Sequence, residues 1–145
     1  MSNLHVLRLL IETAGRERDD AARLSARAQL DARAADATRR TLHEYRADLD
    51  ARAPVRRADA FDPLLVRQFG AFARRLDGAL GEQERAVARC ERIAELRQHE
   101  LVERQKRLRS LQALVERRLA RQAQAETRAD QKRTDEFAAR AHARR

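Results

Sequence analysis

At 145 residues the chain is long enough for one ordinary domain, but charged residues make up 38% of it and aromatic residues only 3%. This composition argues against a compact globular core and is typical of long helices and coiled coils. The formal net charge is +9, and all basic residues except Lys106 and Lys132 are Arg, so the charge indicates either an acidic partner or a bias in composition toward Arg.

The first predicted helix covers about residues 4–53. Apolar side chains recur in it in alternating steps of three and four, the heptad pattern of a coiled coil. The predicted packing positions are Leu7, Leu10, Ala14, Glu17, Ala21, Leu24, Ala28, Asp31, Ala35, Thr38, Leu42, Tyr45 and Leu49. Most of the middle positions are Ala, which buries little surface, so this helix needs a partner to be stable.

A turn is predicted over about residues 54–62. Pro54 and Pro63 bracket the segment PVRRADAFDP, and proline cannot donate a helical hydrogen bond. Asp62 followed by Pro63 is typical of a helix start, with Asp as the N-cap and Pro at the first helical position.

The second predicted helix covers about residues 63–140. Its packing positions are predicted at Leu65, Phe69, Phe72, Leu76, Ala79, Gln83, Ala86, Cys90 and Ile93, with a shift of phase after Arg97 to Leu101, Leu108, Leu111 and Val115. Gly70, Gly78 and Gly81 lie inside this helix, where glycine disfavours helical structure. They indicate either close packing or a bend.

The predicted fold class is all-α, an antiparallel two-helix coiled-coil hairpin that forms a single domain over residues 1–145. At about 1.5 Å per residue the first helix spans about 75 Å and the second about 115 Å. Residue 4 is therefore expected to pair near residue 111. Everything after about Val115 is expected to overhang.

No group of residues indicates catalysis. His5, His43, His99 and His142 are scattered without metal-ligand spacing, Cys90 falls on a packing position, and no Gly-rich phosphate loop is present. We therefore expect no enzyme activity, no metal and no cofactor. The single cysteine fits a reducing cytoplasm, and neither a signal-peptide layout nor an apolar run of about 18 residues is visible. The expected location is the cytoplasm.

Two surfaces are candidates for binding a partner. Near the turn, more than one face of the second helix is apolar, at Phe61, Leu64, Leu65, Val66, Phe69 and Phe72. Packing against one helix covers only one stripe, so the surplus is expected to be exposed and to mark a partner site, unless all of it belongs to the packing seam. The overhang carries nine basic and five acidic residues after Val115. On composition alone it fits a solvated, fraying helix end equally well.

Four segments carry a resemblance to a known family. They are RERDDAARL in the first helix, LHEYRADL before the turn, FGAFARRLDGALGEQ after it, and ETRADQKRTDEFAARA near the C-terminus. Together they resemble the flagellar type III export protein family FliJ over nearly the whole chain, in matching order and spacing. The most specific element is the C-terminal pattern of Arg128, Asp130, Gln131, Lys132, Asp135, Glu136 and Phe137.

The resemblance implies a non-enzymatic protein similar to the central stalk of rotary ATPases. Such a protein binds the hexameric export ATPase with its joined helix termini, contacts the export gate at the inner membrane, handles export chaperones, and is peripheral at the cytoplasmic face of that membrane. The C-terminal pattern is then expected to bind the ATPase. The export-gate surface is expected at Leu42, Tyr45, Phe72, Leu76 and Ala79. The chain departs from the family at Leu49, where a second aromatic residue is common.

Other interpretations are the stalk of a non-flagellar type III secretion system, a basic coiled coil that binds nucleic acid, and a structural coiled coil that self-associates. Nucleic-acid binding is disfavoured because the Arg residues are spread along both helices, interleaved with acids, and few aromatic residues are available for stacking on bases.

Overall fold

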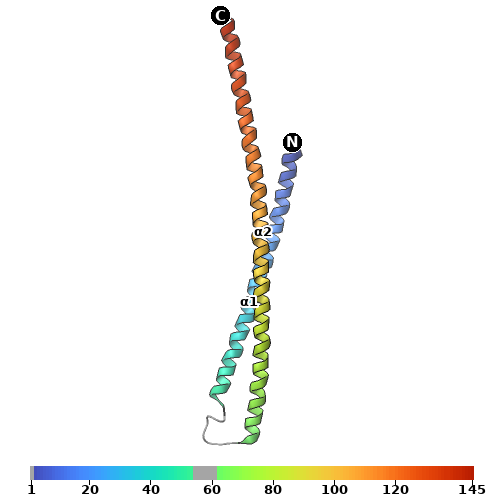
Figure 1. Ribbon diagram of the computed structural model, residues 1–145, viewed down its shortest axis with the longest axis vertical. Coiled ribbons are helices and arrows are strands. Elements are labelled where there is room, and N and C mark those ends of the chain that lie inside the picture. The colour runs from blue at the N-terminus through green and yellow to red at the C-terminus, as the bar shows by residue number, and fades with distance from the viewer. Residues whose placement is uncertain (1, 54–61) are drawn as a thin grey trace. The chain divides into compact units, whose positions relative to one another are not determined.

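The computed structural model describes residues 2–53 and 62–145, and it contains two helices, α1 (Ser2–Ala51) and α2 (Pro63–Ala143) (Figure 1). The described residues form no strand, and the two helices pack against each other, so the predicted all-α two-helix fold is confirmed. Each helix begins and ends within three residues of its predicted bounds. The predicted turn, including Pro54 and Phe61, lies outside the described residues except for Asp62.

The start of α2 has the predicted cap. The Leu64 backbone N–H donates to the Asp62 carboxylate at 3.0 Å, and the Val66 N–H donates to the Asp62 carbonyl oxygen at 3.0 Å. The side chain thereby satisfies one of the free N–H groups at the helix start, and Pro63 occupies a position where no N–H is needed.

The chain divides into two compact units. Unit 1 comprises Met1–Asp19 with Val102–Arg145, and unit 2 comprises Asp20–Leu101. In unit 2 the helices are antiparallel, because partners of rising number on α1 have falling numbers on α2. The bonds that show this are Ser25 Oγ to Gln98 Oε1 at 3.1 Å, Gln83 Nε2 to the Ala35 carbonyl at 2.8 Å, and Arg46 Nε to Asp77 Oδ1 at 2.7 Å. In unit 1, Arg104 and Glu17 form an ion pair at 2.8 Å.

In unit 2 the observed packing seam differs from the predicted seam at every second position. On both helices these positions lie one residue later than predicted. On α1 the seam positions, all of them buried or half-buried, are Ala21, Ser25, Ala28, Ala32, Ala35, Arg39, Leu42, Arg46 and Leu49. On α2 the seam positions, also buried or half-buried, are Val66, Phe69, Ala73, Leu76, Leu80, Gln83, Val87, Cys90, Ala94, Arg97 and Leu101.

The predicted seam residues Leu24, Tyr45, Leu65, Phe72 and Ile93 are consequently exposed. The predicted change of phase after Arg97 is also wrong. Seam positions on α2 continue every seven residues at Ala94, Leu101, Leu108 and Val115. In unit 1 the same correction replaces exposed Leu10 by half-buried Ile11.

Small side chains fill the most buried part of α1. Ala14 in unit 1, and Ala21, Ser25 and Ala28 in unit 2, are all buried, and Ser25 is only 2% exposed. Where larger polar residues occupy the seam, their charged ends reach out to carboxylates, as Arg46 does to Asp77. The aliphatic stem can then pack while the guanidinium stays solvated.

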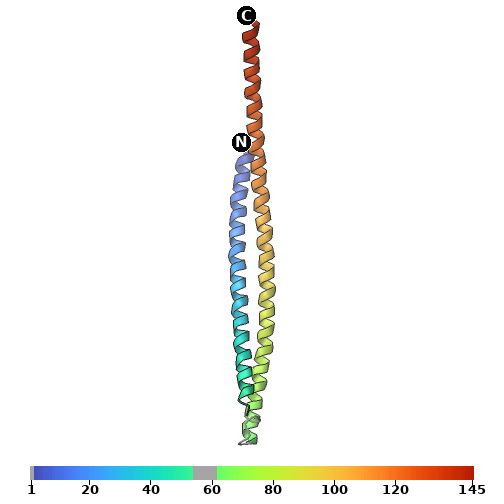
Figure 2. The same cartoon turned by 90° about the vertical axis from the view of Figure 1, so that its left-hand side faces the viewer.

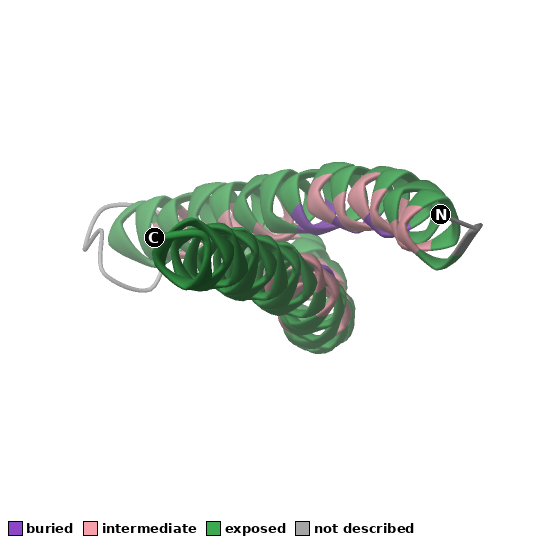
Figure 3. Ribbon diagram, turned by 90° about the horizontal axis from the view of Figure 1, so that it is seen from above, coloured by how far each residue is buried: buried purple, intermediate pink, exposed green. Residues whose placement is uncertain are grey.

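In unit 1 the C-terminal part of α2 extends beyond its α1 partner (Figure 2). Every residue from Glu116 to Arg145 is exposed, and this part of α2 is uniformly green in Figure 3. The predicted overhang is therefore confirmed, and we call residues 116–145 the extension. It stays helical to Ala143 although packing contributes nothing to its stability.

Candidate protein-docking surfaces

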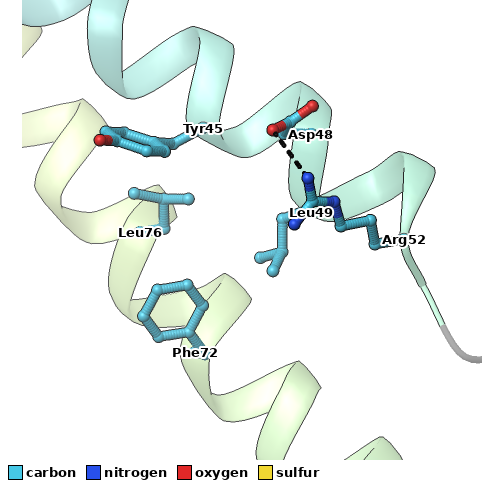
Figure 4. A pocket seen from close by; sticks show the side chains of 6 residues that line it. All are labelled: Tyr45, Asp48, Leu49, Arg52, Phe72 and Leu76. Carbon is cyan, nitrogen blue, oxygen red and sulfur yellow. Dashed lines mark ion pairs between the residues drawn. The ribbon is translucent and has the colours of Figure 1, made fainter.

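A hollow of about 330 Å³ lies in unit 2 between the end of α1 and the start of α2 (Figure 4). Tyr45 and Leu49 of α1 and Phe72 and Leu76 of α2 form its apolar lining. Asp48 and Arg52 line its edge, where they form an ion pair at 3.8 Å. Tyr45 is 62% exposed and Phe72 52% exposed, so both rings are accessible to a partner.

The heptad position of each residue explains this hollow. Leu49 and Leu76 occupy seam positions, whereas Tyr45 and Phe72 directly precede the seam residues Arg46 and Ala73. A residue at this heptad position lies at the edge of the seam. In an antiparallel pair, the residues at this position on the two helices lie on the same side of the seam. The two rings therefore flank the seam together.

The structure brings together three of the five predicted export-gate residues. Tyr45, Phe72 and Leu76 line the hollow, whereas Leu42 and Ala79 are half-buried and are not among its lining residues. Asp48, Leu49 and Arg52 line it without having been predicted as site residues. Their spacing of three, four and seven residues from Tyr45 is the signal that could have found them.

The opposite side of unit 2 is polar. It is formed by residues that directly follow seam positions, and we call it the polar flank: Asp36, His43, Asp50, Asp77 and Glu84. Arg46 forms ion pairs with Asp50 at 2.5 Å and Asp77 at 2.7 Å, and His43 lies 3.5 Å from Glu84. Hydrogen bonds to Asp77 and Asp50 raise the pKa of Arg46 further above its usual range.

We call the other side the apolar flank. Its apolar residues are Leu24 and Tyr45 of α1 with Leu65, Phe72, Ala79, Ala86 and Ile93 of α2, and the same row of α1 also holds Asp31 and Thr38. On α2 these residues recur every seven positions, and Leu65, Phe72 and Ile93 are about half exposed. Unit 2 thus has one flank joined by ion pairs and one that offers apolar side chains to a partner.

The predicted ATPase-binding residues all lie on the extension, and all are exposed. They do not share one face. At 3.6 residues per turn, Asp130 lies on the same side of the helix as Phe137, while Arg128, Lys132 and Asp135 lie on the opposite side. Gln131 and Glu136 lie between these two sides. The pattern therefore surrounds the helix.

Phe137 is 77% exposed and lines a shallow hollow of about 170 Å³ with Arg140, Ala141 and Arg144. Arg133, one turn before Phe137, is within 4.0 Å of Asp130. Arg133, Arg140 and Arg144 were not predicted as site residues, although their spacing from Phe137 places them on its face. An apolar ring surrounded by guanidinium groups suits a partner that offers both an apolar contact and carboxylates.

Within residues 2–53 and 62–145, no three His, Cys, Asp or Glu side chains are grouped so that they could hold a metal ion. Neither described helix contains a stretch long and apolar enough to cross a bilayer.

Comparison with known protein families gives a match. A model of the family described as flagellar FliJ protein matches residues 4–145, which include both candidate surfaces. A comparison with individual curated proteins gives no match. The family is a non-catalytic family of structural or adaptor proteins with a role in flagellar protein export. Since the match covers nearly the whole chain, the protein belongs to the FliJ family.

Proposed function

We propose that this chain is a non-enzymatic stalk and adaptor of the flagellar type III export apparatus. It docks in the hexameric export ATPase ring, stimulates the ATPase, and links it to the export gate and to export chaperones. The single observation that carries the proposal is the extension, whose thirty residues are all exposed while most of them remain helical. Such a helix offers its whole surface to another protein.

The distribution of charged and apolar side chains around the extension supports a ring as the partner. Because Phe137 and Asp130 face one way while Arg128 and Lys132 face the other, a partner that contacts all of them has to surround the helix. A flat protein surface reaches only one side. The interior of a hexameric ring reaches every side, so the proposed partner fits the placement of the residues.

A helix inside a six-fold ring cannot contact all six subunits equally. Unequal contacts have different binding free energies for the nucleotide states of the subunits, and such differences shift the populations of those states. This is the physical basis that we propose for stimulation. The extension carries nine basic and five acidic residues, so contacts with acidic ring surfaces would be favourable.

The export-gate surface is proposed at Leu42, Tyr45, Phe72, Leu76 and Ala79. It is supported by the exposed rings of Tyr45 and Phe72 over an apolar hollow. Exposed aromatic residues in such a place are typical anchors of protein interfaces. Contact with a membrane-embedded gate places the protein, in this proposal, at the cytoplasmic face of the inner membrane.

The test measures ATP hydrolysis by the purified hexameric ATPase with and without the full-length protein, together with co-elution on gel filtration. We expect stimulation by the wild type. For Phe137→Ala and for Lys132→Ala, we expect that about tenfold more protein is needed for half-maximal stimulation, because each substitution removes one anchoring side chain from the interface.

Leu30→Ala is the matched control, because Leu30 is a 58% exposed apolar residue on α1, outside both surfaces. It is expected to stimulate like the wild type. If the wild-type protein neither stimulates the ATPase nor co-elutes with it, the proposal is wrong.

A further inference from the structure

A second apolar hollow lies on α2 in unit 2, apart from the proposed export-gate surface. It measures about 370 Å³ and is lined by Arg89, Arg92, Ile93 and Leu96. Ile93 is 51% exposed and Leu96 57% exposed. These residues are spaced by three, four and seven positions, so they form one stripe along the helix.

This hollow continues the apolar flank. Ile93 follows Phe72 by three heptads, with Ala79 and Ala86 between them. A heptad repeat of apolar residues is the pattern that a packed helix requires, and here it runs beside a seam that is already occupied. The repeat therefore indicates a third helix as the occupant, because a helix presents side chains at the same spacing.

The charges around the hollow define the chemistry of that helix. Ion pairs in this part of α2 involve Arg97 with Glu100 and Lys106 with Glu103. Among the described residues, Arg89 and Arg92 have no ion-pair partner, although both border the apolar floor. Guanidinium groups beside an apolar contact are complementary to carboxylates beside apolar side chains.

We propose that Arg89, Arg92, Ile93 and Leu96 bind an acidic amphipathic helix of another protein. This inference goes beyond the proposed function and does not depend on it. A second copy of this chain is a poor occupant, because its extension has a net charge of +4 from nine basic and five acidic residues.

The test uses a fluorescent peptide of about three heptads, with Leu at the a and d positions and Glu at the e and g positions. Its binding to the full-length protein is measured by fluorescence anisotropy. We expect binding that Ile93→Asp with Leu96→Asp weakens at least about tenfold, because carboxylates would then face carboxylates. Both side chains are more than half exposed, so the change is compatible with folding, which circular dichroism verifies.

A charge exchange tests the role of the arginines. Arg89→Glu with Arg92→Glu should lose the Glu peptide and gain affinity for a peptide with Lys at the same positions. Leu30→Asp, an exposed apolar residue on α1, is the control and should bind like the wild type.

Three outcomes would overturn the inference. They are equal binding of the Glu and Lys peptides by the wild type, binding of phosphatidylglycerol vesicles but not of the Glu peptide, and a wild-type dimer in light scattering that Ile93→Asp with Leu96→Asp converts to a monomer. The last outcome would identify a second copy as the occupant.

Discussion

Among single residues, Asp36 gives the clearest dependence on pH. Arg39 and Arg40 each donate to its carboxylate, with Nη2 atoms 2.6 Å from Oδ1 and Oδ2. These bonds lower the pKa of Asp36 below its ordinary value of 3.8. Because the folded pKa is the lower one, the stabilisation is present above pH 3.8 and is lost as the pH falls through the lowered pKa.

We therefore expect Asp36→Asn to lower the melting temperature at neutral pH, with the difference from the wild type disappearing in strong acid. Melting curves by circular dichroism between neutral pH and about pH 2 measure this. Arg33→Gln is the control, because it removes a nearby charge but leaves the ion pairs of Asp36 with Arg39 and Arg40 in place. A difference between Asp36→Asn and the wild type that stays constant over the whole range would contradict the assignment.

Gly78 is a second residue whose effect can be predicted. It has an ordinary helical conformation within α2, and a Cβ atom built on it meets nothing within 4 Å. The close packing considered for the glycines is therefore absent at Gly78. Gly78→Ala is expected to raise the free energy of unfolding by about 0.5–1 kcal/mol, because alanine favours the helix and nothing obstructs its methyl group.

Urea unfolding measures this change. Gly15→Ala serves as the matched variant, since a Cβ at Gly15 also meets nothing within 4 Å. Unchanged or decreased stability for Gly78→Ala alone would mean that Gly78 serves a bend and not the helix.

For the helices, the sequence predicted existence, bounds and direction but not the full seam. Seam positions shared by prediction and structure, such as Ala28 and Leu76, are apolar in the expected rhythm. The missed ones on α1 include Ser25, Arg39 and Arg46, whose neighbours Leu24, Thr38 and Tyr45 were assigned to the seam. Choosing Leu24 and Tyr45 for the interior over Ser25 and Arg46 failed because small or long-stemmed polar residues pack there.

The same error in the predicted seam prevented the hollow at Tyr45 and Phe72 from being predicted. Tyr45 and Phe72 were predicted both as seam and as export-gate residues, and only their positions beside the seam leave them accessible. The asymmetry between an ion-paired flank and an apolar flank could not be predicted until every second position moved by one residue. A shift of one residue turns a helix by about 100°, enough to move a side chain from the interface to its edge.

For the chain as a whole, packing and exposure are divided between different parts of the sequence. In each unit, buried and half-buried residues come from α1 and from the part of α2 that ends near Val115. The extension beyond it was predicted from helix lengths alone, since this depends on residue counts and not on register. The directions in which its charged side chains point depend only on the helix continuing, and it continues to Ala143.

Deleting residues 116–145 is therefore expected to separate folding from binding. Because these residues are all exposed, their removal takes no side chain from either seam, and the midpoint of thermal unfolding should stay within a few degrees of the wild type. Co-elution with the export ATPase should be lost, whereas binding of the acidic peptide to unit 2 should persist. A large fall in the melting temperature would show that the extension stabilises the packed helices. Retained co-elution would place the ATPase contact elsewhere on the chain.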